Sequence, residues 1–199
     1  MNDAAQRSAL RRQLRQARRA LSPLQQRQAS LQLLRQLAQH PLYRRSRHIA
    51  FYLANDGEID PALLMLHAQR LGKHCYLPVL SEWPVNRMHF QRLLPDQRWT
   101  TNRYGIREPL LHRGRQARPW RLDLILMPLV GFDNTGNRLG MGGGFYDRTF
   151  AFRRQRQYWT GPQLLGLAHD CQKVSQLPTA PWDIPLDGII SDQEVILLT

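Results

Sequence analysis

The stretch RLGMGGGFYDR, residues 138–148, gathers the residue types that bind a phosphate group. Four of its eleven residues are glycine, and glycine lets a phosphate approach backbone N–H groups without a clash with Cβ. Arg138 can add a bidentate charged contact. Asp147 follows closely enough to reach a magnesium ion on the same phosphates. These residues predict an anion site with a divalent metal ion.

The spacing of the glycines excludes the two common phosphate loops. A Walker loop continues with Lys and then Ser or Thr after its last glycine, whereas Phe145 follows Gly144. The dinucleotide-binding pattern needs glycines at i, i+2 and i+5, and the fifth position after Gly140 is Phe145. Taken alone, the cluster therefore leaves open a tight structural turn with a solvent-facing arginine.

The elements around this stretch predict where it lies. The run LDLILMPLV (122–130) is the most apolar of the chain and predicts a central strand, followed by a loop over 131–144 and a helix from about residue 145. Short β-prone runs at 48–54, 74–80, 88–93 and 164–169 alternate with helical patterns such as 61–72. We therefore expect an α/β fold, a mainly parallel open sheet flanked by helices, with ligands beyond the C-terminal ends of its strands. The polar segment 94–121 predicts a loop.

An N-terminal pair of helices is predicted ahead of the sheet. Apolar residues recur at helical spacing over about 3–21, and a stripe of arginines lies beside them: Arg7, Arg11, Arg15 and Arg18. Arg12 and Arg19 are expected on another face. Ser22, Pro23 and Gln25 are typical of a capped helix start, and this second helix should reach about residue 40. The length fits a single domain over 1–199, with the helices of 1–40 packed on it.

The composition limits the function classes. Hydrophobic residues make up 42% of the chain, enough for a core, yet no apolar run reaches the ~18 residues of a transmembrane helix. The N-terminus lacks the apolar core of a signal peptide, so we expect a cytoplasmic protein. The net charge is +13, and residues 1–47 hold eleven arginines against one acidic residue. That excess predicts an anionic partner, either nucleic acid or a polyanionic small molecule, unless it is a solvated helix face.

The longer stretch DNTGNRLGMGGGFYDR (133–148) resembles the signature of the 5-formyltetrahydrofolate cyclo-ligase family, also called 5,10-methenyltetrahydrofolate synthetases. Other segments resemble elements of that family in the same order along the chain: RSALR (7–11), YLANDGEID (52–60), YGIREP (104–109) and APWDIPLDGIISD (180–192). The resemblance spans nearly the whole chain. It implies an ATP-dependent ligase that closes 5-formyltetrahydrofolate to 5,10-methenyltetrahydrofolate and releases ADP and phosphate.

The resemblance also implies the residues of the site. ATP would be bound by Arg7, Ser8, Ala9, Leu10 and Arg11, and by Arg138, Leu139, Gly140, Met141, Gly142, Gly143, Gly144, Phe145 and Tyr146. Arg138 would be the catalytic group. The folate would be bound by Leu53 and Glu58, with Met88 and Tyr104 as a wall for its rings, and Mg²⁺ by Asp147 and Asp183. We expect a monomer that takes a reduced folate and ATP as small-molecule partners and has no membrane or nucleic-acid partner.

Some positions depart from the family pattern, and other interpretations stay open. Arg7 stands where the family often has Lys, Met141 where some members have a basic residue, and Trp182 where many have His. Glu58 can alternatively be a first-turn acid that favours a helix dipole. The competing functions are a nucleic-acid-binding protein that uses the arginine-rich N-terminal helix, and a sugar-phosphate isomerase or acyl-transfer enzyme on a similar scaffold.

Overall fold

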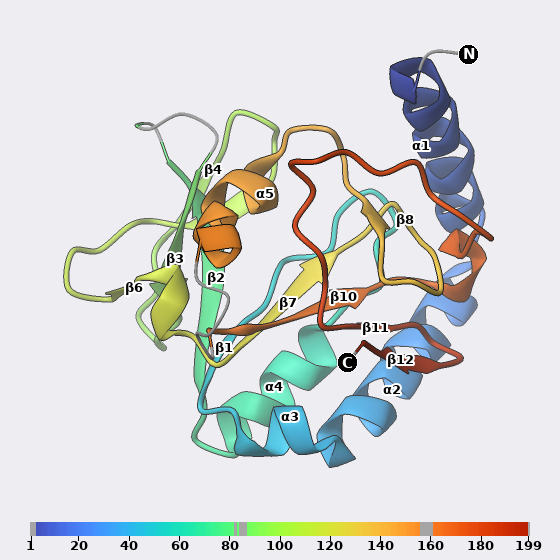
Figure 1. Ribbon diagram of the computed structural model, residues 1–199. Coiled ribbons are helices and arrows are strands. Elements are labelled where there is room, and N and C mark those ends of the chain that lie inside the picture. The colour runs from blue at the N-terminus through green and yellow to red at the C-terminus, as the bar shows by residue number, and fades with distance from the viewer. Residues whose placement is uncertain (1–2, 82, 84–86, 156–160, 199) are drawn as a thin grey trace.

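The computed structural model describes residues 3–81, 83, 87–155 and 161–198, which form an α/β fold around one eight-stranded sheet (Figure 1). Its strands are β1 (His48–Ala50), β2 (His74–Leu80), β3 (Met88–Arg92), β6 (Gln116–Ala117), β7 (Leu124–Pro128), β10 (Gln163–Leu167), β11 (Gly188–Ile190) and β12 (Val195–Leu197). Their spatial order is β12-β11-β10-β7-β1-β2-β3-β6. The central strands from β11 to β2 pair in parallel, whereas β12, β3 and β6 pair antiparallel at the edges. The expected mainly parallel sheet is confirmed.

Strand β7 lies in the middle of the sheet, between β1 and β10. Leu124 and Leu126 belong to the core on one face, while Ile125 and Met127 belong to the core on the other, and all four side chains are fully buried. A parallel strand covered on both faces must be apolar throughout. This explains why the run at 122–130 is the most apolar of the chain.

Helices cover the two faces of the sheet unequally. They are α1 (Asp3–Arg19), α2 (Pro23–Gln39), α3 (Pro41–Arg45), α4 (Ala62–Arg70) and α5 (Phe145–Thr149), with short 3₁₀ helices η1 (Pro119–Arg121), η2 (Ala151–Gln155) and η3 (Asp170–Gln172). Figure 1 shows α2, α3 and α4 together below the sheet and α5 above it. Leu33, Tyr43 and Leu64 from the lower group pack into the core of that face, and Phe150 after α5 packs into the opposite one.

The predicted second helix begins as its sequence indicated. Ser22 is the N-cap of α2, where the Ser22 Oγ accepts a hydrogen bond from the Gln25 N–H at 3.3 Å. In return, the Ser22 N–H donates to the Gln25 Oε1 at 2.9 Å. This reciprocal pair satisfies backbone donors that the helix itself cannot satisfy.

Helix α1 does not cover a sheet face. It packs through Leu14 against Val130, Leu139 and Leu177, which lie on or next to the hairpin of β8 (Gly131–Phe132) and β9 (Arg138–Leu139). Since this hairpin follows β7 directly, α1 is held beside the C-terminal end of the sheet (Figure 1). Among the described helices, none is both long and apolar enough to cross a bilayer.

Several predicted element boundaries are wrong. The strand expected over 48–54 ends at Ala50, and the helix expected from residue 145 is interrupted at Phe150, between α5 and η2. The segment 94–121 is not only loop, because it also contains β4 (Trp99–Thr101), β5 (Arg107–Pro109), β6 and η1. The loop expected over 131–144 contains the β8–β9 hairpin.

The β8–β9 hairpin depends on one buried carboxylate. Asp133, only 1% exposed, accepts hydrogen bonds from the backbone N–H and Oγ1 of Thr135, and from the backbone N–H and Nδ2 of Asn137. A fifth bond comes from the Leu177 N–H at 2.9 Å. Asp and Asn side chains commonly build turns in this way. The DNTGN part of the 133–148 stretch is therefore a structural turn that delivers Arg138 to the site.

Candidate active site

A cavity of about 860 Å³ lies beyond the C-terminal ends of β1 and β7. From β1 the chain continues to β2 on one side of the sheet, whereas β7 pairs with β1 on the other side. In open α/β sheets such a change of direction creates the crevice in which ligands bind. Among the parts of the chain that border the cavity are residues 52–58 after β1, the glycine loop 140–144 after β9, and the arginine side of α1.

Most of the predicted site residues come together in this cavity. Those that line it are Arg7, Arg11, Leu53, Glu58, Met88, Tyr104, Arg138, Gly140, Met141, Gly142, Gly143, Gly144, Phe145, Tyr146, Asp147 and Asp183. They come from segments up to 176 residues apart in sequence, as the contact between Arg7 and Asp183 illustrates. The cavity therefore joins the glycine loop, the segment with Glu58 and the N-terminal helix.

Four of the predicted ATP-binding residues do not line the cavity. Ser8 and Ala9 are exposed on α1, and Leu10 packs instead against the cluster around Leu14. Leu139 is fully buried in that same cluster. On a helix residues three or four apart share a face, so Arg7 and Arg11 face the cavity together, whereas Ser8 and Ala9 point elsewhere. Leu10 lies at the border of this face and packs toward Leu14. The structure narrows the prediction on α1 to these two arginines.

The two arginines are held by different segments. The Arg7 Nη1 and Nη2 donate to the two carboxylate oxygens of Asp183 at 3.0 and 3.2 Å. The Arg11 Nε donates to the Gly140 carbonyl oxygen at 2.8 Å. Burial, together with the neighbouring charge of Arg7, lowers the pKa of Arg11. Helix α1 is thus bound to the glycine loop and to the C-terminal segment, and it concentrates positive charge between them.

Arg138 is buried rather than solvent-facing. Its side chain is 6% exposed, its Nε donates to the Ile184 carbonyl oxygen at 3.2 Å, and its Nη2 forms an ion pair with Asp147. Asp147 also accepts the Ile184 N–H at 3.1 Å. The alternative of a solvent-facing arginine on a structural turn is therefore wrong. Arg138 presents its charge to the cavity from a fixed position.

The glycine loop needs glycine at particular positions. Gly142 has φ 96° and Gly144 has φ 61°, values in the left-handed region that other residues rarely adopt. At Gly143 a Cβ would come within 2.8 Å of the Phe145 ring. Helix α5, which follows, has only five residues. The positive charge of the site therefore comes mainly from arginine side chains rather than from a helix dipole.

Glu58 lies in the segment between β1 and α4, with its side chain 11% exposed. Its Oε2 accepts the Asn55 N–H at 3.1 Å. Burial raises the pKa of Glu58 to about 7, although the nearby Arg18 charge acts in the opposite direction. Helix α4 begins only at Ala62, after an N-cap at Pro61, so Glu58 is not in its first turn. The helix-dipole interpretation of Glu58 is therefore wrong. Glu58 is instead a mostly buried acid that borders the cavity.

An apolar wall faces these charges. Met88 is 7% exposed, and its N–H is anchored on the Thr149 Oγ1 at 3.1 Å. Tyr104 is exposed and places its ring edge-on to Phe145, with the ring centroids 5.9 Å apart. Together with Leu53, these side chains leave space for a flat, partly apolar ligand.

Asp147 and Asp183 both border the cavity, and each is paired with an arginine. Among the described residues, no three His, Cys, Asp or Glu side chains are grouped as a metal site. Magnesium in nucleotide enzymes is usually held by one or two carboxylates and by the substrate's own phosphates. The two aspartates therefore fit a metal ion that arrives with a nucleotide.

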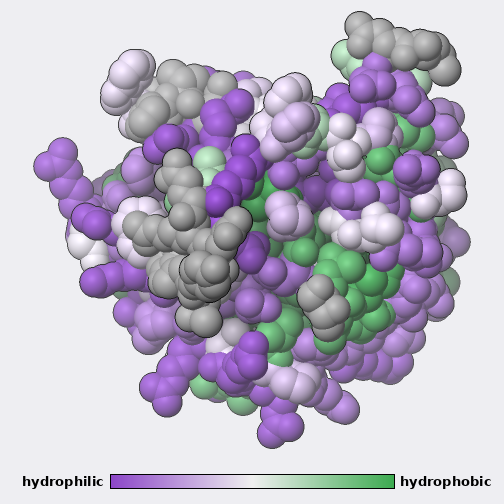
Figure 2. All heavy atoms as spheres, viewed as in Figure 1, coloured by the Kyte–Doolittle hydropathy of each residue, from purple (hydrophilic) through white to green (hydrophobic). Residues whose placement is uncertain are grey.

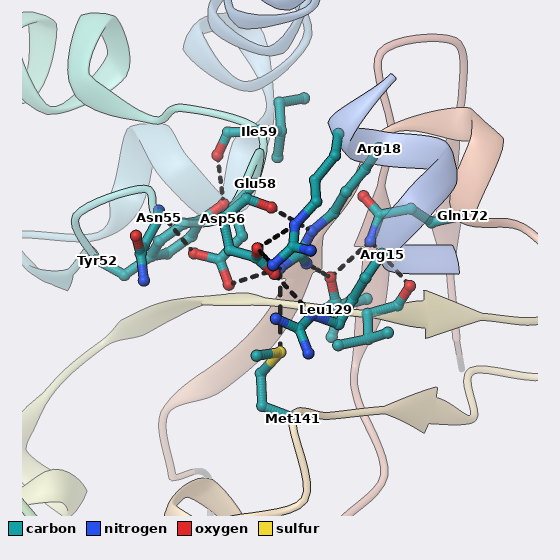
Figure 3. A network of polar contacts seen from close by, with 12 residues as sticks. Arg15, Arg18, Tyr52, Asn55, Asp56, Glu58, Ile59, Leu129, Met141 and Gln172 are labelled. Atoms are coloured by element: carbon teal, nitrogen blue, oxygen red, sulfur yellow. Dashed lines mark hydrogen bonds and ion pairs between the residues drawn. The ribbon is translucent and has the colours of Figure 1, made fainter. Parts of the chain in front are cut away.

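Two arginines of α1 lie elsewhere than predicted. Arg19, expected on another face, lines the cavity and forms an ion pair with Asp56. Arg18, expected in one stripe with Arg7, Arg11 and Arg15, is fully buried (Figure 3). Arg15 lines the cavity as well, and its Nε donates to the Asp56 Oδ2 at 2.7 Å. Residues four apart lie on one helix face, so Arg19 belongs to the face of Arg7, Arg11 and Arg15, whereas Arg18 lies at the border of that face. Arginines every four residues were the sequence signal that could have found Arg19.

Asp56 has an unusual backbone conformation and pairs with Arg15, Arg18 and Arg19. Its φ of 56° is the one positive value of a non-glycine residue within the described part of the chain. Burial acts to raise its pKa, but hydrogen bonds from Arg15, Arg19 and Arg18 lower the pKa of Asp56 to about 2. A residue held in a sparsely populated conformation points to a local functional constraint.

Comparison with known proteins identifies relatives over nearly the whole chain. The model of the 5-formyltetrahydrofolate cyclo-ligase family matches residues 3–192. The 5-formyltetrahydrofolate cyclo-ligase of Escherichia coli (strain K12) is 40% identical over 182 residues, covering 92% of this chain and 98% of the relative. The mouse protein of that name (Mus musculus) is 31% identical and covers 91% of each chain. The solved structure of Aquifex aeolicus 5,10-methenyltetrahydrofolate synthetase superimposes with a TM-score of 0.80 at 30% identity, covering 96% of this chain and 92% of that one.

Proposed function

The chain belongs to the 5-formyltetrahydrofolate cyclo-ligase family and is a ligase, and on that premise we propose that it closes 5-formyltetrahydrofolate to 5,10-methenyltetrahydrofolate with ATP. The names of its relatives support the folate substrate and the ring closure. The single observation that supports the use of ATP is the cavity itself. It places arginines from α1 and Arg138 around a glycine loop on one side, and a buried acid with an apolar wall on the other.

The reaction needs activation because an N-formyl group is amide-like and its oxygen is a poor leaving group. Transfer of the γ-phosphoryl group of ATP to the formyl oxygen makes the formyl carbon electrophilic. N10 of the folate then attacks that carbon, the new C–N bond closes the ring, and the C–O bond breaks with release of phosphate. The N10 proton leaves to solvent. Little covalent chemistry falls to the protein, which must align the two substrates and stabilise phosphoryl charge.

The residues divide this work between the two sides of the cavity. Arg7, Arg11 and Arg138 are the cations for the phosphates, and Arg138 is proposed to stabilise the charge that develops on the transferred group. Buried donors in fixed positions are effective here because they need no reorganisation during the reaction. In the free protein these arginines contact Asp183, Gly140 and Asp147, so ATP binding requires an exchange of partners.

The folate is proposed to bind on the opposite side. The carboxylate of Glu58 would accept hydrogen bonds from the N–H donors of the pterin, and Leu53, Met88 and Tyr104 would contact its rings. An ionised carboxylate binds such donors more strongly than the protonated acid does, because protonation turns one of its two acceptor oxygens into a donor.

Mg²⁺ is proposed to be held by Asp147 and Asp183, where it would neutralise phosphate charge. Both carboxylates would then give up part of their contact with Arg138 and Arg7, which frees these arginines for the phosphates.

The test is to follow the ultraviolet absorbance of 5,10-methenyltetrahydrofolate with purified protein, 5-formyltetrahydrofolate, ATP and MgCl₂. We expect product only when all components are present, with one ADP formed per product. Controls replace ATP by a non-hydrolysable analogue or remove the divalent metal with a chelator. Full turnover without nucleotide would refute the proposal, and turnover unaffected by the chelator would refute the part about the metal.

A further inference from the structure

Arg18 is an arginine that the family resemblance assigns no role, yet it occupies the centre of the site's framework (Figure 3). Its side chain is completely buried. The Nε donates to the Asp56 carbonyl oxygen at 2.8 Å, the Nη2 to the Asp56 Oδ2 at 2.8 Å, and the Nη1 to the Leu129 carbonyl oxygen at 3.0 Å. Each end of the planar guanidinium is therefore bound, which fixes its orientation.

These contacts connect α1 with three other parts of the chain at or next to the cavity. Arg18 belongs to α1, which also carries Arg7 and Arg11. Asp56 belongs to the segment with Glu58, and Leu129 is the residue after β7. The Met141 Sδ of the glycine loop lies 3.9 Å from the Arg18 Nη2. The Leu129 carbonyl oxygen, which accepts from Arg18, also accepts from the Gln172 Nε2 at 2.6 Å.

Arg18 also faces the Glu58 carboxylate directly. The Arg18 Nη2 lies 3.7 Å from the Glu58 Oε1, too long for a good hydrogen bond but within the range of a strong charge interaction. The hydrogen bonds of Arg18 hold the neighbouring Asp56 in its left-handed conformation instead. This leaves Glu58 with hydrogen-bonding capacity while a positive charge stands beside it.

We propose that Arg18 is a positioning residue for folate recognition, which holds the 56–58 turn so that the Glu58 carboxylate stays at the cavity, beside a positive charge that favours its ionised form. The proposal rests on the proposed function, in which Glu58 binds the pterin. It assigns Arg18 two separable tasks. The forked hydrogen bonds set the place of the turn, and the positive charge sets the protonation of Glu58.

The groups around Glu58 make the charge of Arg18 important. Arg18 and Arg15 face it from α1, Asp56 and Tyr52 from its own segment, and Tyr146 from α5. Burial raises the pKa of Glu58 to about 7, and the Arg18 charge lowers it more than the Asn55 N–H or Arg15 does. Asp56 acts to raise it. Since the pKa already lies near neutrality, loss of the Arg18 charge would raise the pKa of Glu58 further and shift the group toward its protonated form at neutral pH.

The experiment measures the affinity for 5-formyltetrahydrofolate by calorimetry between pH 5.5 and 8.5. The variants are Arg18→Met, which removes both the fork and the charge, and Arg18→Lys, which keeps the charge. Each is also made in a Glu58→Gln background. The matched controls are Arg12→Met and Arg12→Lys, because Arg12 is an exposed arginine on the same helix. Thermal melting checks that every variant is folded.

We expect wild-type affinity to rise with pH through the titration of Glu58. Arg18→Met should weaken binding at pH 7 by ~10-fold or more, and should move the midpoint up by ~1 pH unit, because an opposite charge at this distance has been removed. Arg18→Lys should keep the midpoint near that of the wild type while still weakening binding. In the Glu58→Gln background neither substitution should weaken binding much further, and both Arg12 variants should match the wild type.

Each other result contradicts a defined part of the inference. Wild-type midpoint and affinity in the Arg18 variants would overturn it, and so would losses of equal size with and without Glu58, because they would show a general structural effect. If Arg18→Met does not fold, Arg18→Lys and its double variant decide the question alone. A wild-type protein that does not bind 5-formyltetrahydrofolate would instead refute the proposed function and remove the premise.

Discussion

Glu58 is a carboxylate that the fold holds where water can solvate it only in part. Burying this carboxylate lowers the stability of the folded protein, and other interactions in the fold offset that loss. A ligand that presents N–H donors to the carboxylate would replace the contacts with water that burial removes. Acids with raised pKa values at cavities are often functional for this reason. In Glu58 the position, the raised pKa of about 7 and the neighbouring Arg18 all fit such a role.

We predict that Glu58→Gln weakens 5-formyltetrahydrofolate binding by ~1.5–3 kcal/mol, the range for a hydrogen bond to a charged group. ATP affinity should change little, because the cations proposed for the phosphates belong to other segments. The substitution should also affect stability with a defined sign. Between pH 4.5, the ordinary pKa, and about 7, the folded protein binds more protons than the unfolded chain, so stability falls as pH rises.

The melting temperature tests the stability part of this prediction. Glu58→Gln should remove that fall, so it should stabilise the protein relative to the wild type more at pH 8 than at pH 5. Unchanged folate affinity combined with lower stability at both pH values would show that Glu58 has only a structural role.

At the scale of the element, the glycine loop is a backbone feature more than a set of side chains. Its glycines differ in what the backbone demands. Gly142 has φ 96°, whereas Gly140 has no positive φ, and a Cβ there would meet only the Arg138 Nη1, at 3.8 Å. The repeated glycines of the sequence therefore do not have equal importance in the free protein.

We predict that Gly142→Ala disrupts the loop and Gly140→Ala does not. The first forces alanine into a strained conformation that costs on the order of 1–2 kcal/mol or displaces the loop from Arg11. It should weaken ATP binding and slow turnover, while the matched Gly140→Ala variant stays near the wild type in melting temperature and ATP affinity. Equal ATP affinities in the two variants would show that this loop conformation is not needed for ATP binding.

At the scale of the whole molecule, the excess positive charge has more than one use. Figure 2 shows mainly hydrophilic side chains over the face in view. Arg7, Arg11, Arg15 and Arg19 border the cavity and Arg18 is buried, so much of the charge of α1 belongs to the site. Arg12 on α1 and Arg27 on α2 are exposed and lie outside the lining of the cavity.

We predict that Arg138→Lys and the double substitution Arg12→Ala with Arg27→Ala have opposite consequences. Arg138→Lys keeps the charge but loses the fork, and should lower ATP-dependent turnover by ~100-fold. The double variant should leave turnover nearly unchanged, because exposed charges far from a ligand are screened. Measurements of turnover, ATP affinity and the salt dependence of RNA binding decide between the ATP-dependent ligase and the nucleic-acid-binding protein. Loss of tight RNA binding in the double variant, with wild-type turnover in Arg138→Lys, would support the nucleic-acid alternative instead.

The sequence by itself determined those features that depend on local patterns. The apolar run around Leu126 predicted the central strand because a parallel strand is buried on both faces, and Ser22 with Gln25 predicted the start of α2 because capping is a contact between near neighbours. The glycine-rich stretch and the segment with Glu58 indicated the family because their residue order is long and specific.

Only the tertiary structure decided what the long arginine side chains contact. Arg138 is buried against Ile184, Arg19 pairs with Asp56, and Arg18 joins α1 to Leu129. These partners lie 37 to 111 residues away in sequence. Helical periodicity fixes the direction of a Cβ, but the place of a guanidinium group several bonds farther out depends on which acids and carbonyl groups the packed elements bring within its reach.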